Sequence, residues 1–147
     1  YKGRDGCRTP MVWTRQAANG GFSDSAHSWL PVPESHYHLA VDQQTHVAGS
    51  VLNHYRATLA FRKAHPALIN GAMSFLEADG EVLAFVRGEG EGRMLLALNL
   101  GRQQVSWSPP AHLKALKLAH MPGFSPAWDG ETVKLQGHDV FCAHIGS

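Results

Sequence analysis

Residues 82–100 read Val82-Leu83-Ala84-Phe85-Val86-Arg87-Gly88-Glu89-Gly90-Glu91-Gly92-Arg93-Met94-Leu95-Leu96-Ala97-Leu98-Asn99-Leu100, and this stretch decides the fold class. Two short apolar runs, Val82–Arg87 and Arg93–Leu100, flank a turn that contains the three glycines of this stretch. Short apolar runs bounded by glycine are typical of strands. Glycine also supplies the positive φ that a hairpin turn needs. We therefore predict an antiparallel hairpin over residues 82–100.

Further strand candidates lie on both sides of this hairpin, separated by turn residues. Asp79-Gly80 suits a tight turn before it, and Pro109-Pro110, Pro122-Gly123 and Asp129-Gly130 mark later corners. Residues 114–118 contain good helix formers, but the short length of the segment between turn signals favours a strand. The sequence predicts an antiparallel β-sandwich over residues 67–147. Its other expected strands are Met73–Ala78, Gln104–Trp107, Leu113–Ala119, Thr132–Leu135 and Val140–His144.

One amphipathic helix is expected between Ser50 and His65. At 3.6 residues per turn, its larger apolar side chains fall within roughly a 100° arc, which is typical of a helix face packed in a core. Ser50 is a suitable N-cap, cations occupy the last turn, and Pro66 ends the helix. The apolar stripe, as we call it below, consists of Val51, Leu52, Tyr55 and Leu59.

Composition excludes several classes of protein. The 147 residues fit one domain, or one domain with an appendage, and 13 basic against 12 acidic side chains leave a net charge of +1. This balance argues against a nucleic-acid partner. Apolar runs such as Met94–Ala97 are too short to cross a membrane, and the N-terminal residues do not resemble a secretory signal, so a cytoplasmic protein is expected.

The residues that most often bind metals or form disulfides are scattered. Cys7 and Cys142 lie at opposite ends of the chain, which favours two free thiols over a disulfide framework. Among ten histidines only His36 and His38 lie close together, without the cysteine or carboxylate partners typical of a zinc site. No metal and no cofactor are expected.

Residues 1–48 show no periodicity and are rich in glycine, proline and aromatic residues. Such a long irregular segment inside a compact domain usually indicates function or a missing partner surface. Its first part, Gly3-Arg4-Asp5-Gly6-Cys7-Arg8-Thr9-Pro10-Met11-Val12-Trp13, places two arginines and an aspartate among residues that set backbone shape. Arginine suits multidentate binding of carboxylates or sugar hydroxyls, whereas a surface loop with an unimportant Arg–Asp pair is the simpler alternative.

That segment strongly resembles the loop after the eighth barrel strand in α-glucosidases of glycoside hydrolase family 13, the α-amylase superfamily. Five more segments resemble consecutive motifs of the same family, in the same order, so that the resemblance covers residues 2–71. Beyond residue 71 the chain is similar to the family's C-terminal β-domain in pattern only. The five segments are Gly21-Phe22-Ser23, Trp29-Leu30-Pro31-Val32, Val41-Asp42-Gln43-Gln44, Ser50–Arg56 and Arg62–Leu68.

The resemblance implies the C-terminal portion of a larger enzyme built on a (β/α)8 barrel. Residues 1–66 are then the loop after the last barrel strand plus the last barrel helix, and residues 67–147 the β-domain, a mainly β, α+β fragment. The implied activity is retaining, exo-acting release of glucose from the non-reducing end of short α-glucosides. That chemistry needs two carboxyl groups about 5–5.5 Å apart. In the family they precede the segment that matches residue 1, so this chain alone is expected to be inactive.

Within the chain, the resemblance assigns substrate binding to Arg4 and Arg8. Arg4 matches the family arginine that helps to hold the terminal glucose. Arg8 matches a second loop arginine, nearer either the leaving group or the loop's own scaffold, and Asp5 matches the local structural partner of Arg8. Trp13 and Trp29 are expected to anchor the loop rather than to stack on sugar. The sequence departs from the family at Val12 and at Val47-Ala48-Gly49, and the first departure puts fine specificity in question.

Two alternatives from other classes stay open. In the first, the sandwich is a non-catalytic carbohydrate-binding module, which requires Trp107 and Trp128 to form an exposed flat platform. In the second, the chain is a purely structural support whose apolar helix stripe is left uncovered. An uncovered stripe predicts either self-association of the isolated chain or packing of the helix on the sandwich. The expected partners are α-glucoside oligosaccharides and the upstream barrel segment, with no nucleic acid and no membrane.

Overall fold

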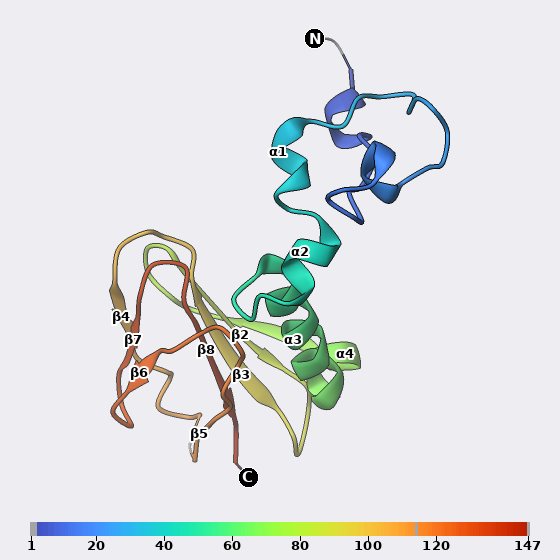
Figure 1. The fold of residues 1–147 in the computed structure, drawn as a ribbon. Helices are drawn as coiled ribbons and strands as arrows, with labels where there is room; N and C mark the ends of the chain where they lie inside the picture. Colours follow the sequence, from blue (N-terminus) through green and yellow to red (C-terminus); the bar gives the residue numbers. More distant parts are fainter. Residues whose placement is uncertain (1–2, 114, 147) are drawn as a thin grey trace. The chain divides into compact units, whose positions relative to one another are not determined.

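The computed structural model describes residues 3–113 and 115–146 and divides the chain into two compact units, residues 1–56 and 57–147. Helix α3 (Val51–Ala64) contains the boundary between the units, and its bounds confirm the expected helix. Figure 1 shows short helical segments in the first unit and β-strands in the second. The domain boundary after residue 66 stays a prediction about the whole protein.

The first unit contains several short helical segments that the sequence did not predict. They are the 3-10 helices η1 (Asp5–Cys7) and η2 (Ala18–Gly21) and the α-helices α1 (Glu34–Tyr37) and α2 (Val41–Thr45). A segment of three to five residues is too short to show helical periodicity, so each of these elements was missed.

A small network of backbone bonds holds the first unit together. The Val41 N–H donates to the Val12 carbonyl at 3.1 Å, and the Arg15 N–H donates to the Asp42 carboxylate at 3.1 and 3.2 Å. Gly20 has φ of 64° and lies against Val12, where a Cβ would come within 2.9 Å of the valine side chain. A glycine is therefore required here both by backbone conformation and by space.

Helix α3 begins at a side-chain network that confirms Ser50 as its N-cap. The Ser50 Oγ accepts the Asn53 N–H at 3.2 Å and donates to the Gln44 carbonyl at 2.8 Å. The Gln44 Oε1 accepts the Leu52 N–H at 3.1 Å, so a second N–H of the first helical turn also has a partner. The free N–H groups at a helix start are satisfied here by polar side chains.

The second unit is the expected β-sandwich, built from two antiparallel sheets. The first sheet has the strand order β1-β2-β3-β8-β5 and the second has the order β4-β7-β6. Strands β2 and β3 pair from Val82↔Asn99 to Arg87↔Met94, which confirms the hairpin that decided the fold class. The bounds are β1 Met73–Leu76, β2 Val82–Arg87, β3 Met94–Asn99, β4 Val105–Trp107, β5 Lys117–Leu118, β6 Ala127–Trp128, β7 Val133–Leu135 and β8 Val140–His144.

Three details of the strand prediction were wrong. The strand expected over Leu113–Ala119 is reduced to β5, Lys117–Leu118, and Lys114 lies outside the described residues. Strand β6, Ala127–Trp128, was missed because two residues show no alternation. Directly after Pro66 the chain forms a further short helix, α4 (Ala67–Asn70), since proline tolerates the first helical turn while it ends the helix before it.

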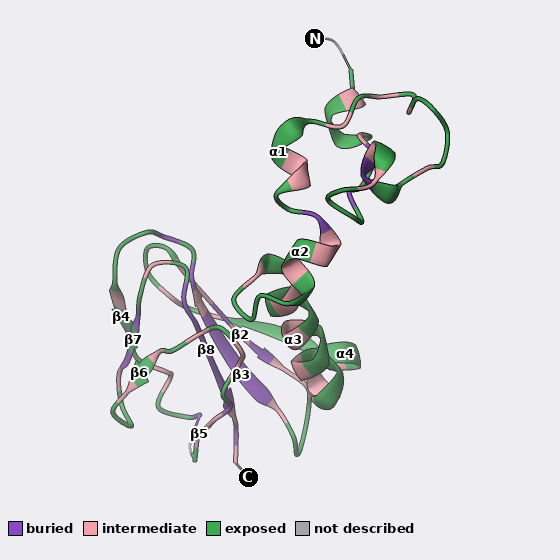
Figure 2. Cartoon of the chain, in the orientation of Figure 1, coloured by how far each residue is buried: buried purple, intermediate pink, exposed green. Residues whose placement is uncertain are grey.

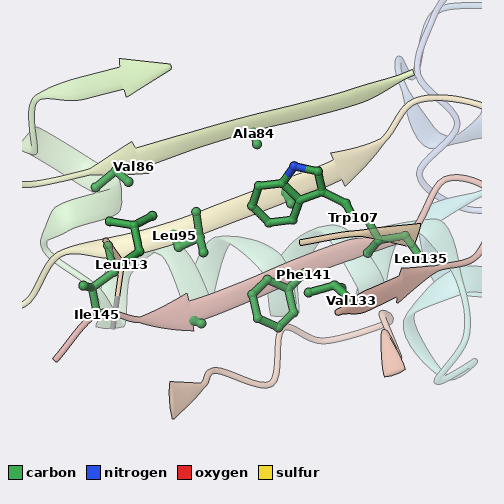
Figure 3. Close-up of a cluster of buried hydrophobic side chains, with 11 residues drawn as sticks. Ala84, Val86, Leu95, Trp107, Leu113, Val133, Leu135, Phe141 and Ile145 are labelled. Atoms are coloured by element: carbon green, nitrogen blue, oxygen red, sulfur yellow. The ribbon is translucent and has the colours of Figure 1, made fainter. Parts of the chain in front are cut away.

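The core lies between the two sheets. Alternate residues of β2, β3 and β8 face it, because side chains along a strand alternate between the two faces of a sheet. Figure 3 shows the Trp107 and Phe141 rings among the side chains of Leu95, Val133 and Leu135. Together these five residues come from the four strands β3, β4, β7 and β8. Burying these large apolar groups between the sheets is the main stabilising contribution to this unit.

Strands β3 and β8 are buried on their second face as well, as their purple colour in Figure 2 shows. Here Met94, Leu96 and Cys142 pack with Phe61 from α3 and Leu68 from α4. The end of α3 therefore covers the outer face of the larger sheet.

The helix face that makes this contact is not the apolar stripe. We expected Tyr55 and Leu59 in the core, but Tyr55 is 64% exposed, and Val51 and Leu59 are exposed as well. At about 100° per residue, Phe61 lies roughly 130° around the helix from the centre of the stripe. The helix thus has two apolar faces, and the sheet covers the one that carries Phe61.

A buried polar residue links the two sheets. Asn99, at the end of β3, is 2% exposed. Its Nδ2 donates to the carbonyls of Gln103 at 2.7 Å, Gln136 at 2.8 Å and Leu135 at 3.3 Å, and its Oδ1 accepts the Gly101 N–H at 2.9 Å. Every polar atom of this side chain has a partner, which makes its burial tolerable. Across residues 3–113 and 115–146, no helix is long and apolar enough to cross a membrane.

Candidate functional site

The segment that contains Arg4 and Arg8 folds as one tight turn. The Cys7 N–H and the Cys7 Sγ both donate to the Arg4 carbonyl, at 3.1 and 2.9 Å, and the Arg8 N–H donates to the Asp5 carbonyl at 3.0 Å. Both arginines are exposed. The bond between Arg8 and Asp5 belongs to the backbone of η1, so the expected role of Asp5 as the local partner of Arg8 stays a prediction.

Arg8 lines a hollow of about 200 Å³, which we call the Arg8 hollow. The lining includes the side chains of Phe22 and Trp29, although Trp29 is 81% exposed and Phe22 is 54% exposed. Arg4 is not among the lining residues that the structure describes. The remaining lining residues are Pro10, Ser23, His27, Ser28 and Leu30.

The structure therefore brings Arg8, one of the two expected site residues, together with Trp29, one of the two loop tryptophans. The roles assigned to Arg4 and Arg8 stay predictions. Sequence reasoning missed Phe22 and His27 as lining residues, although Phe22 belongs to a segment that resembled the family. The expectation that Trp29 anchors the loop receives no support from its own unit, where its side chain is largely exposed.

The loop that carries Phe22 and Trp29 is held by short-range hydrogen bonds. The Asn19 Nδ2 donates to the carbonyls of Ser23 and Ser25, and the Ser25 N–H donates to the Ser23 Oγ at 3.1 Å. The Ser28 Oγ donates to the Leu30 carbonyl at 2.6 Å, next to Trp29. These bonds fix the backbone on both sides of the hollow and reduce the entropy that binding a ligand would cost.

Val12, where the sequence departs from the family, is a packing residue in this structure. Its side chain is buried against Gly20, and its carbonyl accepts the Val41 N–H. It is not among the described lining residues of the Arg8 hollow. The departure thus changes the packing beneath the loop.

The sandwich tryptophans do not form a platform for sugar. Trp107 is only 8% exposed and belongs to the core, and Trp128 is half-buried with its ring edge-on to Phe141, 5.5 Å away at 68°. The exposed flat surface that a carbohydrate-binding module of this kind requires is therefore missing from these two residues.

Two titratable groups of the sandwich are perturbed. Hydrogen bonds from the backbone N–H groups of Thr132 and then Glu131 lower the pKa of the Asp129 carboxyl. Burial raises the pKa of the Cys142 thiol to about 12, so this thiol stays protonated near neutral pH, whereas Cys7 is an exposed free thiol. The described residues contain no group of three His, Cys, Asp or Glu side chains placed to hold a metal ion.

Comparison with known proteins identifies the family. Residues 1–71 match the family model described as "Alpha amylase, catalytic domain". Over 145 residues, or 99% of its length, the chain is 41% identical to the "Probable alpha-glucosidase" of Rhizobium meliloti (strain 1021), of which it covers 26%. It is 32% identical over 113 residues to an oligo-1,6-glucosidase of Halalkalibacterium halodurans, covering 76% of this chain and 20% of that protein.

Solved structures of other proteins are similar to this chain as well. The chain matches the alpha-glucosyl transfer enzyme XgtA with a TM-score of 0.86 at 41% identity, over 99% of this chain and 26% of that one. An isomaltulose synthase from Klebsiella sp. LX3, at 24% identity and a TM-score of 0.75 over 97% of this chain and 26% of that one, shares the fold. The chain spans about a quarter of the length of these relatives. It belongs to the alpha-amylase family, glycoside hydrolase family 13, and its sandwich matches the C-terminal β-domain of such an enzyme.

Proposed function

We propose that this chain is the C-terminal part of a retaining, exo-acting α-glucosidase that releases glucose from the non-reducing end of short α-glucosides. The observation that carries the proposal is the 41% identity, over nearly the whole chain, to a protein named as an α-glucosidase. Relatives named as oligo-1,6-glucosidases support glucosides with α-1,6 links as candidate substrates.

Within this proposal, Arg4 binds the terminal glucose. Its side chain is exposed, and its carbonyl accepts hydrogen bonds from both the N–H and the thiol of Cys7, so its backbone is fixed. A planar guanidinium donates two parallel hydrogen bonds to neighbouring sugar hydroxyls, which the single ammonium of lysine cannot reproduce. Arg8, four residues later, supplies the second contact.

The test is Arg4→Lys in the full-length enzyme, assayed on maltose and isomaltose. We expect kcat/KM to fall more than about tenfold, or about 1.4 kcal/mol of transition-state stabilisation. Arg15→Lys is the matched control, because Arg15 is exposed in the same unit and contacts Asp42 through its backbone N–H, which the substitution keeps. A kcat/KM within about twofold of wild type for Arg4→Lys would show that Arg4 does not hold the substrate.

The isolated 147-residue chain is expected to lack activity. Retaining hydrolysis needs a nucleophilic carboxylate and a protonated acid held about 5–5.5 Å apart across the glycosidic bond. In the proposal both groups belong to the barrel segment that precedes this chain. Purified chain should not hydrolyse a chromogenic α-glucoside above the rate in buffer, and activity should appear only with the barrel segment present. Turnover by the chain alone that survives further purification would contradict the proposal.

The proposed second role of the chain is support of the barrel through helix α3. The sheet covers the face that carries Phe61, and the stripe that includes Val51 and Tyr55 is exposed. Neighbouring apolar side chains that are exposed together are typical of an interaction surface. In the whole enzyme we propose that barrel neighbours cover it, and in the isolated chain we expect it to cause self-association.

A further inference from the structure

The backbone of Arg4 is held from both sides within a few residues. Gly3 precedes it, and the short helix η1 (Asp5–Cys7) follows it. Its own φ of −97° and ψ of 13° lie in the sparsely allowed region between the α and β regions, where many active-site residues are found. The contacts that keep Arg4 in this conformation therefore bear on what its guanidinium can do.

Cys7 makes the contact on the C-terminal side of Arg4. Its N–H and its Sγ both donate to the Arg4 carbonyl, at 3.1 and 2.9 Å. The N–H bond is part of every 3-10 turn, whereas the second bond needs a side chain with a donor. Cysteine and serine have such a donor, and alanine does not. The side chain at position 7 thus restrains Arg4 more than the backbone alone would.

Gly3 sets the direction of the chain on the N-terminal side of Arg4. Its φ is 133°, a conformation that residues with a Cβ rarely adopt. A Cβ at Gly3 would meet no described atom within 4 Å, so the backbone conformation, and not lack of space, requires glycine here. Gly6 provides the contrast: it has equal room for a Cβ among the described residues, but it is not one of the glycines with positive φ.

We propose that Gly3 and Cys7 are positioning residues that orient the Arg4 side chain toward the terminal glucose. This inference rests on the proposed role of Arg4. A long side chain loses conformational entropy when it binds, and a backbone that is already fixed lowers this cost. Two parallel hydrogen bonds from a planar guanidinium also depend on its direction more than the contact of a single point charge does.

Both residues should act on the sugar only through Arg4. The thiol of Cys7 already donates to the Arg4 carbonyl, and Gly3 has no side chain. Their effect on catalysis should therefore shrink when Arg4 itself is replaced. A double-mutant cycle measures this dependence directly, and a general loss of stability would not produce it.

The experiment measures kcat/KM of the full-length enzyme on 4-nitrophenyl α-glucoside. For Gly3→Ala we expect a fall of about tenfold, because alanine disfavours positive φ. For Cys7→Ala we expect a fall of about threefold, because a thiol is a weak donor. Cys7→Ser, which keeps a donor, should recover most of that loss. Gly6→Ala is the matched control and should stay within about twofold of wild type.

The cycle combines Gly3→Ala with Arg4→Lys. In the Arg4→Lys enzyme, Gly3→Ala should lower kcat/KM by less than about threefold, because the guanidinium that it orients is already lost. Cys7→Ala replaces Gly3→Ala in the cycle if the latter does not fold, and it should then cause no further loss.

Three results would contradict the inference, and they can be told apart. An unchanged kcat/KM in folded Gly3→Ala or Cys7→Ala enzyme would overturn it while the role of Arg4 stands. The full loss retained in the Arg4→Lys enzyme would show that these residues do not act through Arg4. An Arg4→Lys enzyme as efficient as wild type would overturn the proposed role of Arg4 and this inference together.

Discussion

Replacement of Asn99 by alanine should severely destabilise the sandwich. Three contacts of its amide, to Gln103, Gln136 and Gly101, are 2.7–2.9 Å long, and the side chain is 2% exposed. The two bonds that the amide donates to Gln103 and Gln136 contribute about 1 kcal/mol net each, and the buried Gly101 N–H left without its acceptor costs about 1–3 kcal/mol. We therefore expect Asn99→Ala to lower the free energy of unfolding by about 3–5 kcal/mol. For a domain of about 60–100 residues this lowers Tm by at least about 12 °C.

Urea unfolding of the chain, followed by circular dichroism, measures the change, because a shift of the midpoint at constant slope reports stability alone. Asn99→Asp has the same shape but loses the donors to three carbonyls, so it should be at least as unstable at neutral pH. The control is Gln103→Ala, which removes an exposed side chain and keeps the carbonyl that Asn99 binds, and its effect should stay within about 0.5 kcal/mol. A loss below about 1 kcal/mol for Asn99→Ala would refute the reasoning.

Four other substitutions or treatments give independent tests. Ser50→Ala should remove the N-cap of α3 at a cost of about 1 kcal/mol, measured as hydrogen exchange about fivefold faster in the first helical turn. At pH 8 a thiol reagent should modify Cys7 at once and Cys142 only on unfolding, because burial raises the pKa of Cys142 to about 12; two rapid equivalents would contradict this. Because the pKa of Asp129 is lowered in the folded state, its carboxylate stabilises the fold above the unfolded-state pKa of about 4. This stabilisation is lost as the pH falls through the folded-state pKa. Asp129→Asn should therefore make the urea midpoint less sensitive to acid. Tyr55→Ser should shift the isolated chain toward monomer in sedimentation, and an unchanged wild-type monomer across concentrations would argue against self-association.

The sandwich was predictable because its strands alternate and its turns carry glycine at the required positions. The β2–β3 hairpin, with Gly88, Gly90 and Gly92 all at positive φ, has both signals and was predicted with nearly the observed bounds. Strand β6 is followed by the turn signal Asp129-Gly130, but its two residues are too few to show alternation, so only their pairing with β7 identifies the strand. Strands β2 and β3 are long enough to be predicted from the sequence, whereas β6 is too short.

The apolar face of helix α3 shows a different limit. Periodicity finds an apolar stripe, but it does not say which part of the protein covers it. The helix has one large aromatic residue, Phe61, on its other side, and this residue packs with Leu96 and Leu68. Phe61 alone, outside the stripe, makes the contact with the sheet, and the periodicity of the stripe does not predict this contact.

The candidate site illustrates the same limit for function. The sequence singled out Arg4, Arg8 and Trp29 as separate motif members, yet spacing alone does not place a residue at position 8 beside one at position 29. Arg8 and Trp29 line one hollow in a segment held by local contacts: hydrogen bonds in the turn after Arg4 and from the Asn19 amide, and close packing of Gly20 on Val12. None of these contacts leaves a periodic apolar pattern. Such loops are organised by individual side chain–backbone bonds, which explains why residues 1–48 show no periodic pattern and still form a defined hollow.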